Sequence, residues 1–185
     1  MCDFQDIDRA CGTPNPAGTE AEIFLVPAAN IDVFPALLAD SVVPPALPTY
    51  TQQVTYDGDI DLIPETAFVK YKIIVDSGEV KDTVAGPTDG KSVTSTLDFQ
   101  MASTDPEVIG AMQCLINACM VAIVVEKSGH KRVLGTPNIP AKIESAEATS
   151  GKTSEDLRGV TFQLKSFTGK AAPFYTGTID LDPLT

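Results

Sequence analysis

The sequence TDPEVIGAMQCLINACMVAIVVEKSGHKRVLGT, residues Thr104–Thr136, predicts a helix that passes directly into a β-hairpin. Thr104 and Glu107 have the spacing of a capping box, and Pro106 suits the first turn, where its missing N–H costs nothing. Apolar residues then recur at helical spacing, which predicts one buried helix face. They are Val108, Ile109, Met112, Leu115, Ile116 and Cys119. We therefore expect one α-helix over about residues 104–119.

A β-branched run, Met120–Val125, follows the helix without a turn residue between them. Ser128-Gly129 predicts a tight turn, and Lys131–Leu134 is the returning strand. The first strand of this hairpin is apolar on both faces, as in a strand that is covered on both sides. We expect it to be central in its sheet.

Further segments alternate or cluster β-forming residues, and they predict additional strands. These segments are residues 22–27, 52–56, 60–63, 68–76, 93–101, 139–143, 160–167 and 173–181. Asp57-Gly58 predicts a hairpin between the second and third of them, and the polar residues 77–92 predict a long loop between two long strands. Residues 144–158 read as another loop. The proline-rich residues 30–48 read as extended chain with one helical turn near residues 36–40.

Length and composition bound the fold class. The chain has 185 residues, including 14 prolines and 13 glycines. With one convincing helix and roughly eight to ten strands, this favours a mainly β fold, a β-sandwich or barrel with extended arms or loops. Residues 1–19 are expected to form an N-terminal arm in which Phe4 and Ile7 are the apolar anchors. Residues 20–185 are expected to form a single domain.

The formal net charge of −12 argues against a protein that grips nucleic acid through its phosphates, because such binding needs clustered Lys and Arg. The first residues are acidic and polar, unlike the apolar segment of a signal peptide. No apolar run approaches the roughly 20 residues of a membrane helix. We expect synthesis in a cytoplasm and no membrane partner.

The four cysteines are Cys2, Cys11, Cys114 and Cys119. In a chain of this length they do not form a disulfide framework. Five positions apart on a helix, Cys114 and Cys119 point in different directions, so we expect neither their pairing nor shared metal ligation. We expect reduced thiols, with a Cys2–Cys11 link as the alternative.

Two motifs suggest ligand chemistry, and each has a plainer interpretation. Ala146–Thr153, AEATSGKT, resembles a relaxed phosphate-binding loop, but such a loop needs a following helix, and here a strand is expected instead. The carboxylates Asp57, Asp59 and Asp61 alternate as calcium ligands do, but the EF-hand loop requires Gly at its sixth position and Glu at its twelfth. Three solvated acids on one strand face explain that pattern more simply.

His130 is the only histidine and lies beside the predicted tight turn. A zinc site needs more imidazole or thiolate ligands than the chain offers at suitable spacing. A catalytic base needs a nucleophile in reach, and no nucleophile-elbow motif is present. We therefore assign no catalytic, cofactor-binding or metal-binding residues and expect a protein that is not an enzyme.

The order of segments from Val121 to Gly177 resembles the tail tube (major tail) proteins of tailed bacteriophages. The resemblance rests on a strand, an SG turn, KRVLGT, a Thr-Ser-Gly-Lys loop, Asp156-x-x-Gly159, the strand VTFQL and the final PFYTG. It covers about a third of the chain and concerns the order and spacing of elements as much as identities. The resemblance implies a β-sandwich or barrel with one helix, in subunits that form stacked hexameric rings with a continuous inner β-barrel.

This resemblance implies a structural role in the virion. The chain would pair with copies of itself and with other tail proteins, and genome DNA would pass through the lumen without specific binding. An arm, a long loop or the chain termini would reach the next ring. The alternatives are another virion component, such as a tail terminator, connector or capsid decoration protein, and a monomeric β-sandwich binding module. A phosphohydrolase that uses Lys152 is the enzyme alternative.

Overall fold

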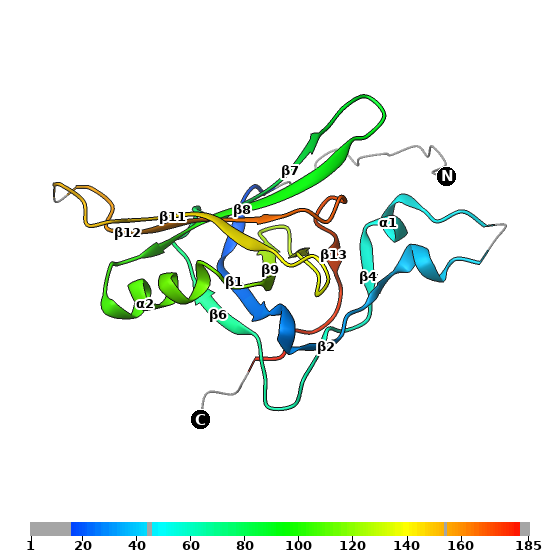
Figure 1. Cartoon of the computed structure of the whole chain (residues 1–185), viewed down its shortest axis with the longest axis horizontal. Coiled ribbons are helices and arrows are strands. Elements are labelled where there is room, and N and C mark those ends of the chain that lie inside the picture. The colour runs from blue at the N-terminus through cyan, green and yellow to red at the C-terminus, as the bar shows by residue number, and fades with distance from the viewer. Residues whose placement is uncertain (1–15, 44–45, 154, 182–185) are drawn as a thin grey trace.

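The computed structural model describes residues 16–43, 46–153 and 155–181, and it shows a mainly β fold (Figure 1). The Phe4 and Ile7 anchors, Cys2 and Cys11 lie outside the described residues. The large sheet contains β1 (Thr19–Pro27), β3 (Ala36–Leu37), β4 (Thr55–Asp57), β6 (Val69–Lys72), β9 (Met120–Glu126), β10 (Lys131–Leu134) and β13 (Phe174–Tyr175). Its strand order is β3-β4-β13-β10-β9-β1-β6.

The second sheet has four strands, and we call it the open sheet. It consists of β7 (Glu79–Ala85), β8 (Ser92–Ala102), β11 (Lys142–Thr149) and β12 (Gly159–Ser166), in the order β11-β12-β8-β7. All of its neighbouring strands are antiparallel. The β7–β8 and β11–β12 hairpins project in opposite directions beyond the body of the molecule (Figure 1). A small third sheet pairs β2 (Ile31–Val33) with β5 (Asp61–Leu62).

The predicted helix–hairpin unit forms the centre of the molecule. β9 pairs with β1 on one side and β10 on the other, and its residues from Met120 to Val124 are buried. Ala122 and Val124 face the core between the two sheets, whereas Val121 and Ile123 face a second core on the other side of the large sheet. The prediction of a central strand with two apolar faces is confirmed.

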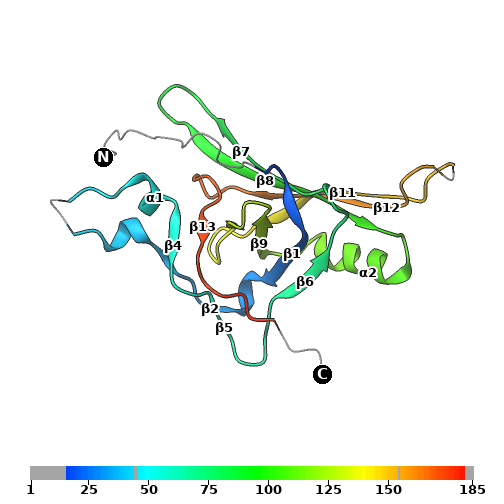
Figure 2. The same ribbon diagram turned by 180° about the vertical axis from the view of Figure 1, so that it is seen from behind.

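Helix α2 (Pro106–Leu115) packs beneath the open sheet, beside β6 (Figure 2). Leu115 is buried there, with Val108, Ile109 and Met112 packed against the same core. The helix is shorter than predicted, and Cys119 lies beyond it and is exposed. The predicted capping box is wrong: Asp105 is the N-cap without a side-chain capping bond. Thr104 Oγ1 instead accepts a hydrogen bond from Arg158 Nε at 2.7 Å.

Several sequence predictions are wrong. The residues predicted as a long loop, 77–92, contain β7, and those predicted as a loop at 144–158 contain most of β11. Asp57-Gly58 does not form a hairpin, because β4 pairs with β3 and β13 while β5 pairs with β2. Part of the predicted strand 52–56 is helix α1 (Tyr50–Gln53), capped by Thr49 in a capping box. The helical turn expected near residues 36–40 is the 3₁₀ turn Leu38–Ser41, and a second 3₁₀ turn spans Ala28–Asn30.

One charged network ties the two sheets together. Arg132 of β10 donates from Nη2 to Asp82 Oδ2 of β7 at 2.5 Å and from Nη1 to Glu126 Oε1 of β9 at 3.2 Å. Asp82 Oδ1 also accepts from Ser95 Oγ at 2.5 Å and from the Ala172 amide at 3.0 Å. Only 13% of the Arg132 side chain is exposed, so the pair is largely shielded from solvent. Shielded, multiply bonded pairs contribute more than surface pairs do.

We expect Asp82→Asn to lower the free energy of unfolding at neutral pH by about 1–3 kcal/mol. Burial raises the pKa of Asp82, but the hydrogen bonds from Ser95 and Ala172 and the charge of Arg132 outweigh it, so the pKa lies below 3.8. The folded state therefore holds the ionised carboxylate to lower pH than the unfolded state does. Its stabilisation is present above 3.8 and is lost as the pH falls through the folded-state pKa.

Urea unfolding of both proteins at a series of pH values measures this contribution. The difference between the wild type and Asp82→Asn should narrow as the pH falls below 3.8. Asp76→Asn is the matched control, because the Asp76 side chain is 70% exposed in its pair with Lys127. That control should change stability by less than about 0.5 kcal/mol. A difference that stays constant over the whole acid range would contradict the role given to the carboxylate.

Candidate functional site

The open sheet has one buried face and one polar outer face. Leu97, Phe99 and Phe162 belong to the inner row of the sheet and are buried against the large sheet and α2. Because side chains alternate along a strand, the residues between them point away from the core. These outward residues are Glu79, Lys81, Thr83 and Ala85 of β7; Ser92, Thr94, Thr96, Asp98 and Gln100 of β8; Thr161, Gln163 and Lys165 of β12; and Lys142, Ser145, Glu147 and Thr149 of β11.

The charges of this outer face nearly balance. Its bases are Lys81, Lys142 and Lys165, and its acids are Glu79, Asp98, Glu147 and Glu144, which lies at the irregularity of β11. Gln163 Nε2 donates to Asp98 Oδ1 at 2.8 Å, and Lys165 pairs with Glu144 at 3.3 Å. The face carries no aromatic or large aliphatic side chain among these positions. The negative charge of the chain is therefore concentrated elsewhere, and this face is a hydrophilic, nearly neutral surface of Ser, Thr and Gln.

The outer edge of β11 carries backbone groups that point away from the sheet. The Ser103 amide donates to the Arg158 carbonyl at 3.0 Å, which identifies that opposed pair as a hydrogen-bonded one. Such pairs alternate in an antiparallel ladder, so every second residue of β12 bonds to β8 and the residues between them bond to β11. Glu147, opposite Thr161, therefore bonds to β12. Ala146 and Ala148 direct their N–H and C=O groups to the free edge.

The same alternation identifies the free groups on β7. Residues of β8 that do not bond to β12 bond to β7, which makes Lys81 and Thr83 the inward-bonding residues of that strand. Val80, Asp82 and Val84 present their backbone groups at the opposite edge of the sheet. The open sheet thus ends on both sides in a row of backbone donors and acceptors with no partner strand among the described residues.

The two edge strands of the open sheet, β7 and β11, run in opposite directions. Four strands that alternate in direction leave the first and the last running oppositely. A copy of the chain related by rotation about an axis parallel to the strands would place its β7 antiparallel to β11. Free strand edges can pair with a strand of another chain. If the same rotation relates each copy to the next, the edge-to-edge pairing repeats until the ring of copies closes. The arrangement can build a continuous antiparallel barrel from identical copies.

The residues weighed for chemistry lie apart from one another. Gly151–Thr153 is at the tip of the β11–β12 hairpin, and β12 follows where a phosphate-binding loop needs a helix. Asp59 Oδ1 accepts from the Thr178 amide at 2.6 Å and so anchors the C-terminal segment. Within residues 16–43, 46–153 and 155–181 there is no cluster of three or more potential metal ligands. Cys114 and Cys119 are free thiols.

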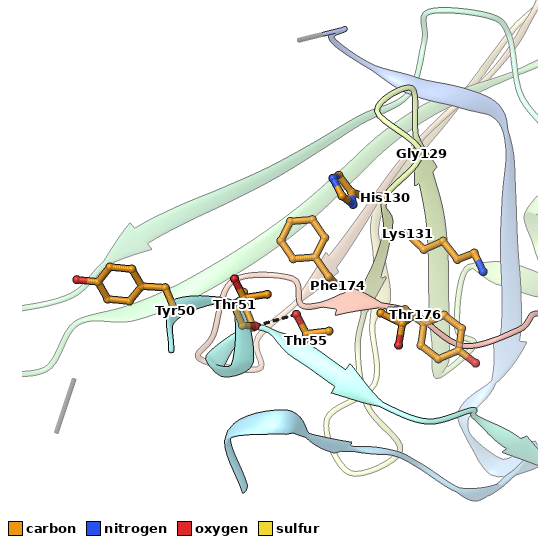
Figure 3. A pocket seen from close by; sticks show the side chains of 10 residues that line it. Tyr50, Thr51, Thr55, Gly129, His130, Lys131, Phe174 and Thr176 are labelled. Atoms are coloured by element: carbon orange, nitrogen blue, oxygen red, sulfur yellow. Dashed lines mark hydrogen bonds between the residues drawn. The ribbon is translucent and has the colours of Figure 1, made fainter. Parts of the chain in front are cut away.

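His130 lines an open groove on the surface of the molecule. Figure 3 shows the residues that line the groove, which come from α1, the β9–β10 turn and β13. The groove has a volume of about 670 Å³. The imidazole lies edge-on to the Phe174 ring, with centroids 5.4 Å apart.

No helix among the described residues is long and apolar enough to cross a membrane. Comparison of the chain with protein-family models, with curated proteins and with solved structures finds no match.

Proposed function

We propose that this chain is a structural subunit that assembles into hexameric rings, stacked as the tube of a phage tail. The observation that carries the proposal is the open sheet, whose two free edges run in opposite directions and whose outer face is polar. Each subunit would contribute its four strands to one inner barrel. The hexamer and the stacking are taken from the resemblance to tail tube proteins. The open sheet supports the proposal that a ring would close by pairing β7 of one subunit with β11 of the next.

The outer face of the open sheet would line the lumen. Lys142 and Lys165 lie opposite each other, with Glu144 paired to Lys165, and the other positions are acids, Ser, Thr and Gln apart from Lys81, so phosphates would meet no larger cluster of positive charge. DNA would pass without specific binding. In this role the protein acts through its surfaces and needs no catalytic residue or cofactor. Its partners would be copies of itself and other tail proteins, and its location the virion tail after synthesis in a host cytoplasm.

We expect the purified subunit to form rings or short tubes as its concentration rises, measured by light scattering and negative-stain electron microscopy. Higher ionic strength should favour assembly, because it screens repulsion between copies that each carry a formal charge of −12. A monomer at every concentration and salt condition would contradict the proposal. Single rings or trimers without stacking would indicate a tail terminator, connector or decoration protein instead.

A further inference from the structure

The free backbone groups at the two edges of the open sheet belong to residues on the same face. These residues are Val80, Asp82 and Val84 on β7 and Ala146 and Ala148 on β11. They lie on the core side of the sheet, because Val80 is opposite the buried Leu97 and Ala146 is opposite the buried Phe162. Residues directly opposed in an antiparallel pair share a face. The β7 edge can therefore pair with the β11 edge of a second copy while the polar faces of both sheets stay on one side.

The polar face also carries two charged side chains that have no ion-pair partner within residues 16–43, 46–153 and 155–181. They are Lys81 of β7 and Glu147 of β11, and both are exposed. Since they lie on opposite edges of the sheet, they can meet only between two copies. Opposite charges in directly opposed positions stabilise a strand pair, and like charges destabilise it.

These charges distinguish the possible registers of the pairing. If Lys81 of one copy lies opposite Glu147 of the next, Thr83 lies opposite Ser145, because antiparallel partners are numbered in opposite directions. A shift by two residues one way sets Glu79 against Glu147, which opposes like charges. A shift the other way places Glu147 opposite Thr83 and breaks the ion pair. The register with Lys81 opposite Glu147 is the one that the charges favour.

The same register gives the strands the slope of a closed barrel. A straight row of directly opposed residues crosses the sheet of one copy: Glu79, Asp98, Gln163 and Ser145. In this register the row continues to Thr83 of the next copy, so it climbs from position 79 to position 83 of β7. That rise is about 14 Å along the strands for about 19 Å across four strands, a tilt of about 35°, and barrels tilt by about 35–45°. If Ser145 faced Lys81 or Ala85 instead, the tilt would be about 20° or about 47°.

The direction of the climb has the hand that a barrel requires. When a strand of L-residues runs upward, a residue whose side chain points at the viewer directs its N–H and C=O to the right. Leu97 points into the core and bonds to β12, so from the core side, with β8 upward, β12 lies to the right of β8 and β7 to its left. With β7 upward, the row therefore passes to the left as it climbs. Strands with the normal right-handed twist give this slope when the polar face is inside the barrel.

We propose that neighbouring subunits join with Lys81 of one copy opposite Glu147 of the next, as an ion pair on the polar face, and with Thr83 opposite Ser145. The inference rests on the proposed ring assembly and names the residues that meet at each contact. Both pairs are of the non-hydrogen-bonded kind, with Cα atoms about 4.5 Å apart.

Disulfide formation between copies tests this register. The background variant replaces Cys2, Cys11, Cys114 and Cys119 by serine. In that background, Thr83→Cys/Ser145→Cys should give a ladder of covalently joined copies on a non-reducing gel after mild oxidation, because the expected Cα separation suits a disulfide. Within one copy the two positions are at least three strand spacings apart, about 14 Å, so any such link joins two copies.

Two matched cysteine pairs report the neighbouring registers. Lys81→Cys/Ser145→Cys and Ala85→Cys/Ser145→Cys should remain largely unlinked, while electron microscopy shows rings of each variant. Rings in which either of these pairs links in place of Thr83→Cys/Ser145→Cys, or in which none of the three links, would overturn the register and leave ring assembly standing. A wild type that forms no rings at any concentration would overturn both.

Charge reversal gives a second measurement of the same contact. Lys81→Glu and Glu147→Lys should each raise the concentration at which rings appear by about two- to fivefold, because each variant opposes like charges. The double variant Lys81→Glu/Glu147→Lys restores an opposite pair with the charges exchanged, and it should assemble as the wild type does. A double variant whose defect equals the combined defects of the single ones would contradict the direct opposition of the two residues.

Discussion

Ala148→Pro is expected to stop ring assembly while leaving the subunit folded. Ala148 lies on β11 with its N–H directed at the free edge, so proline removes no hydrogen bond to β12. Its side chain is exposed, and edge strands accept proline at such positions. We expect the free energy of unfolding to change by less than about 1 kcal/mol. Assembly should be lost at every concentration at which the wild type forms rings.

The expected loss is large because a ring repeats the same defect at each contact. Proline removes the donor and places its ring where the neighbouring strand would lie. Val84→Pro makes the corresponding change on the other edge, since the Val84 backbone also points away from β8 and its side chain is 63% exposed. Each variant alone should abolish assembly, because every interface needs one β7 edge and one β11 edge.

Ala148→Thr is the matched control. It keeps the backbone donor and adds a β-branched side chain that suits a strand, so assembly should persist. Electron microscopy and light scattering measure assembly, and urea unfolding measures the fold of each variant. If Ala148→Pro and Val84→Pro both assembled as the wild type does, the edges of the open sheet would not be the ring interface.

The sequence was sufficient to predict those strands that bury one or both faces. In β8, which the sequence predicts as a strand over 93–101, Ser95, Leu97, Phe99 and Met101 are buried and alternate with outward side chains. In β9 the continuous apolar run corresponds to a strand with a core on each side. A buried face forces a period of two on the side chains, and this period can be read without any knowledge of the partner strands.

β7 and β11 escaped prediction because little of either is buried. β7 has residues such as Lys81 and Thr83 on one face, and on the other only Val80 packs against the core. A hairpin that extends beyond the core needs no apolar alternation, so its sequence resembles a polar loop. The weak alternation of Val80 and Val84 was the available signal.

The candidate site could not be found from residue types. Its binding groups are main-chain N–H and C=O groups, for example those of Ala146 and Val80. Nearly every residue carries such groups, so no residue type marks them in the sequence. Which of them are free depends on strand order and register, and both are set by contacts between distant segments. The two-residue strands β3 and β13 have the same difficulty, because such short pairings are selected by the surrounding fold.

Phe162→Ala is expected to cause the largest loss of stability of any single truncation considered. The Phe162 ring of β12 is fully buried and stacks on Phe99 of β8, with centroids 4.9 Å apart and planes at 13°. Removing a buried phenyl ring from a packed core costs about 3–5 kcal/mol, through lost burial and the cavity left behind. Since whole domains are stable by about 5–15 kcal/mol, this variant should be close to unfolding at 37 °C.

Phe167→Ala provides the comparison that separates burial from residue type. Phe167 follows β12 by one residue and is 60% exposed, with Lys165 Nζ 5.0 Å from its ring centre. Its truncation should cost less than about 1 kcal/mol. In thermal unfolding, Phe162→Ala should lower Tm by about 6–20 °C, whereas Phe167→Ala should shift it by only a few degrees. Similar losses in the two variants would mean that Phe162 does not lie between the open sheet and the large sheet. That result would also contradict the assignment of the polar face of the open sheet as its outward face.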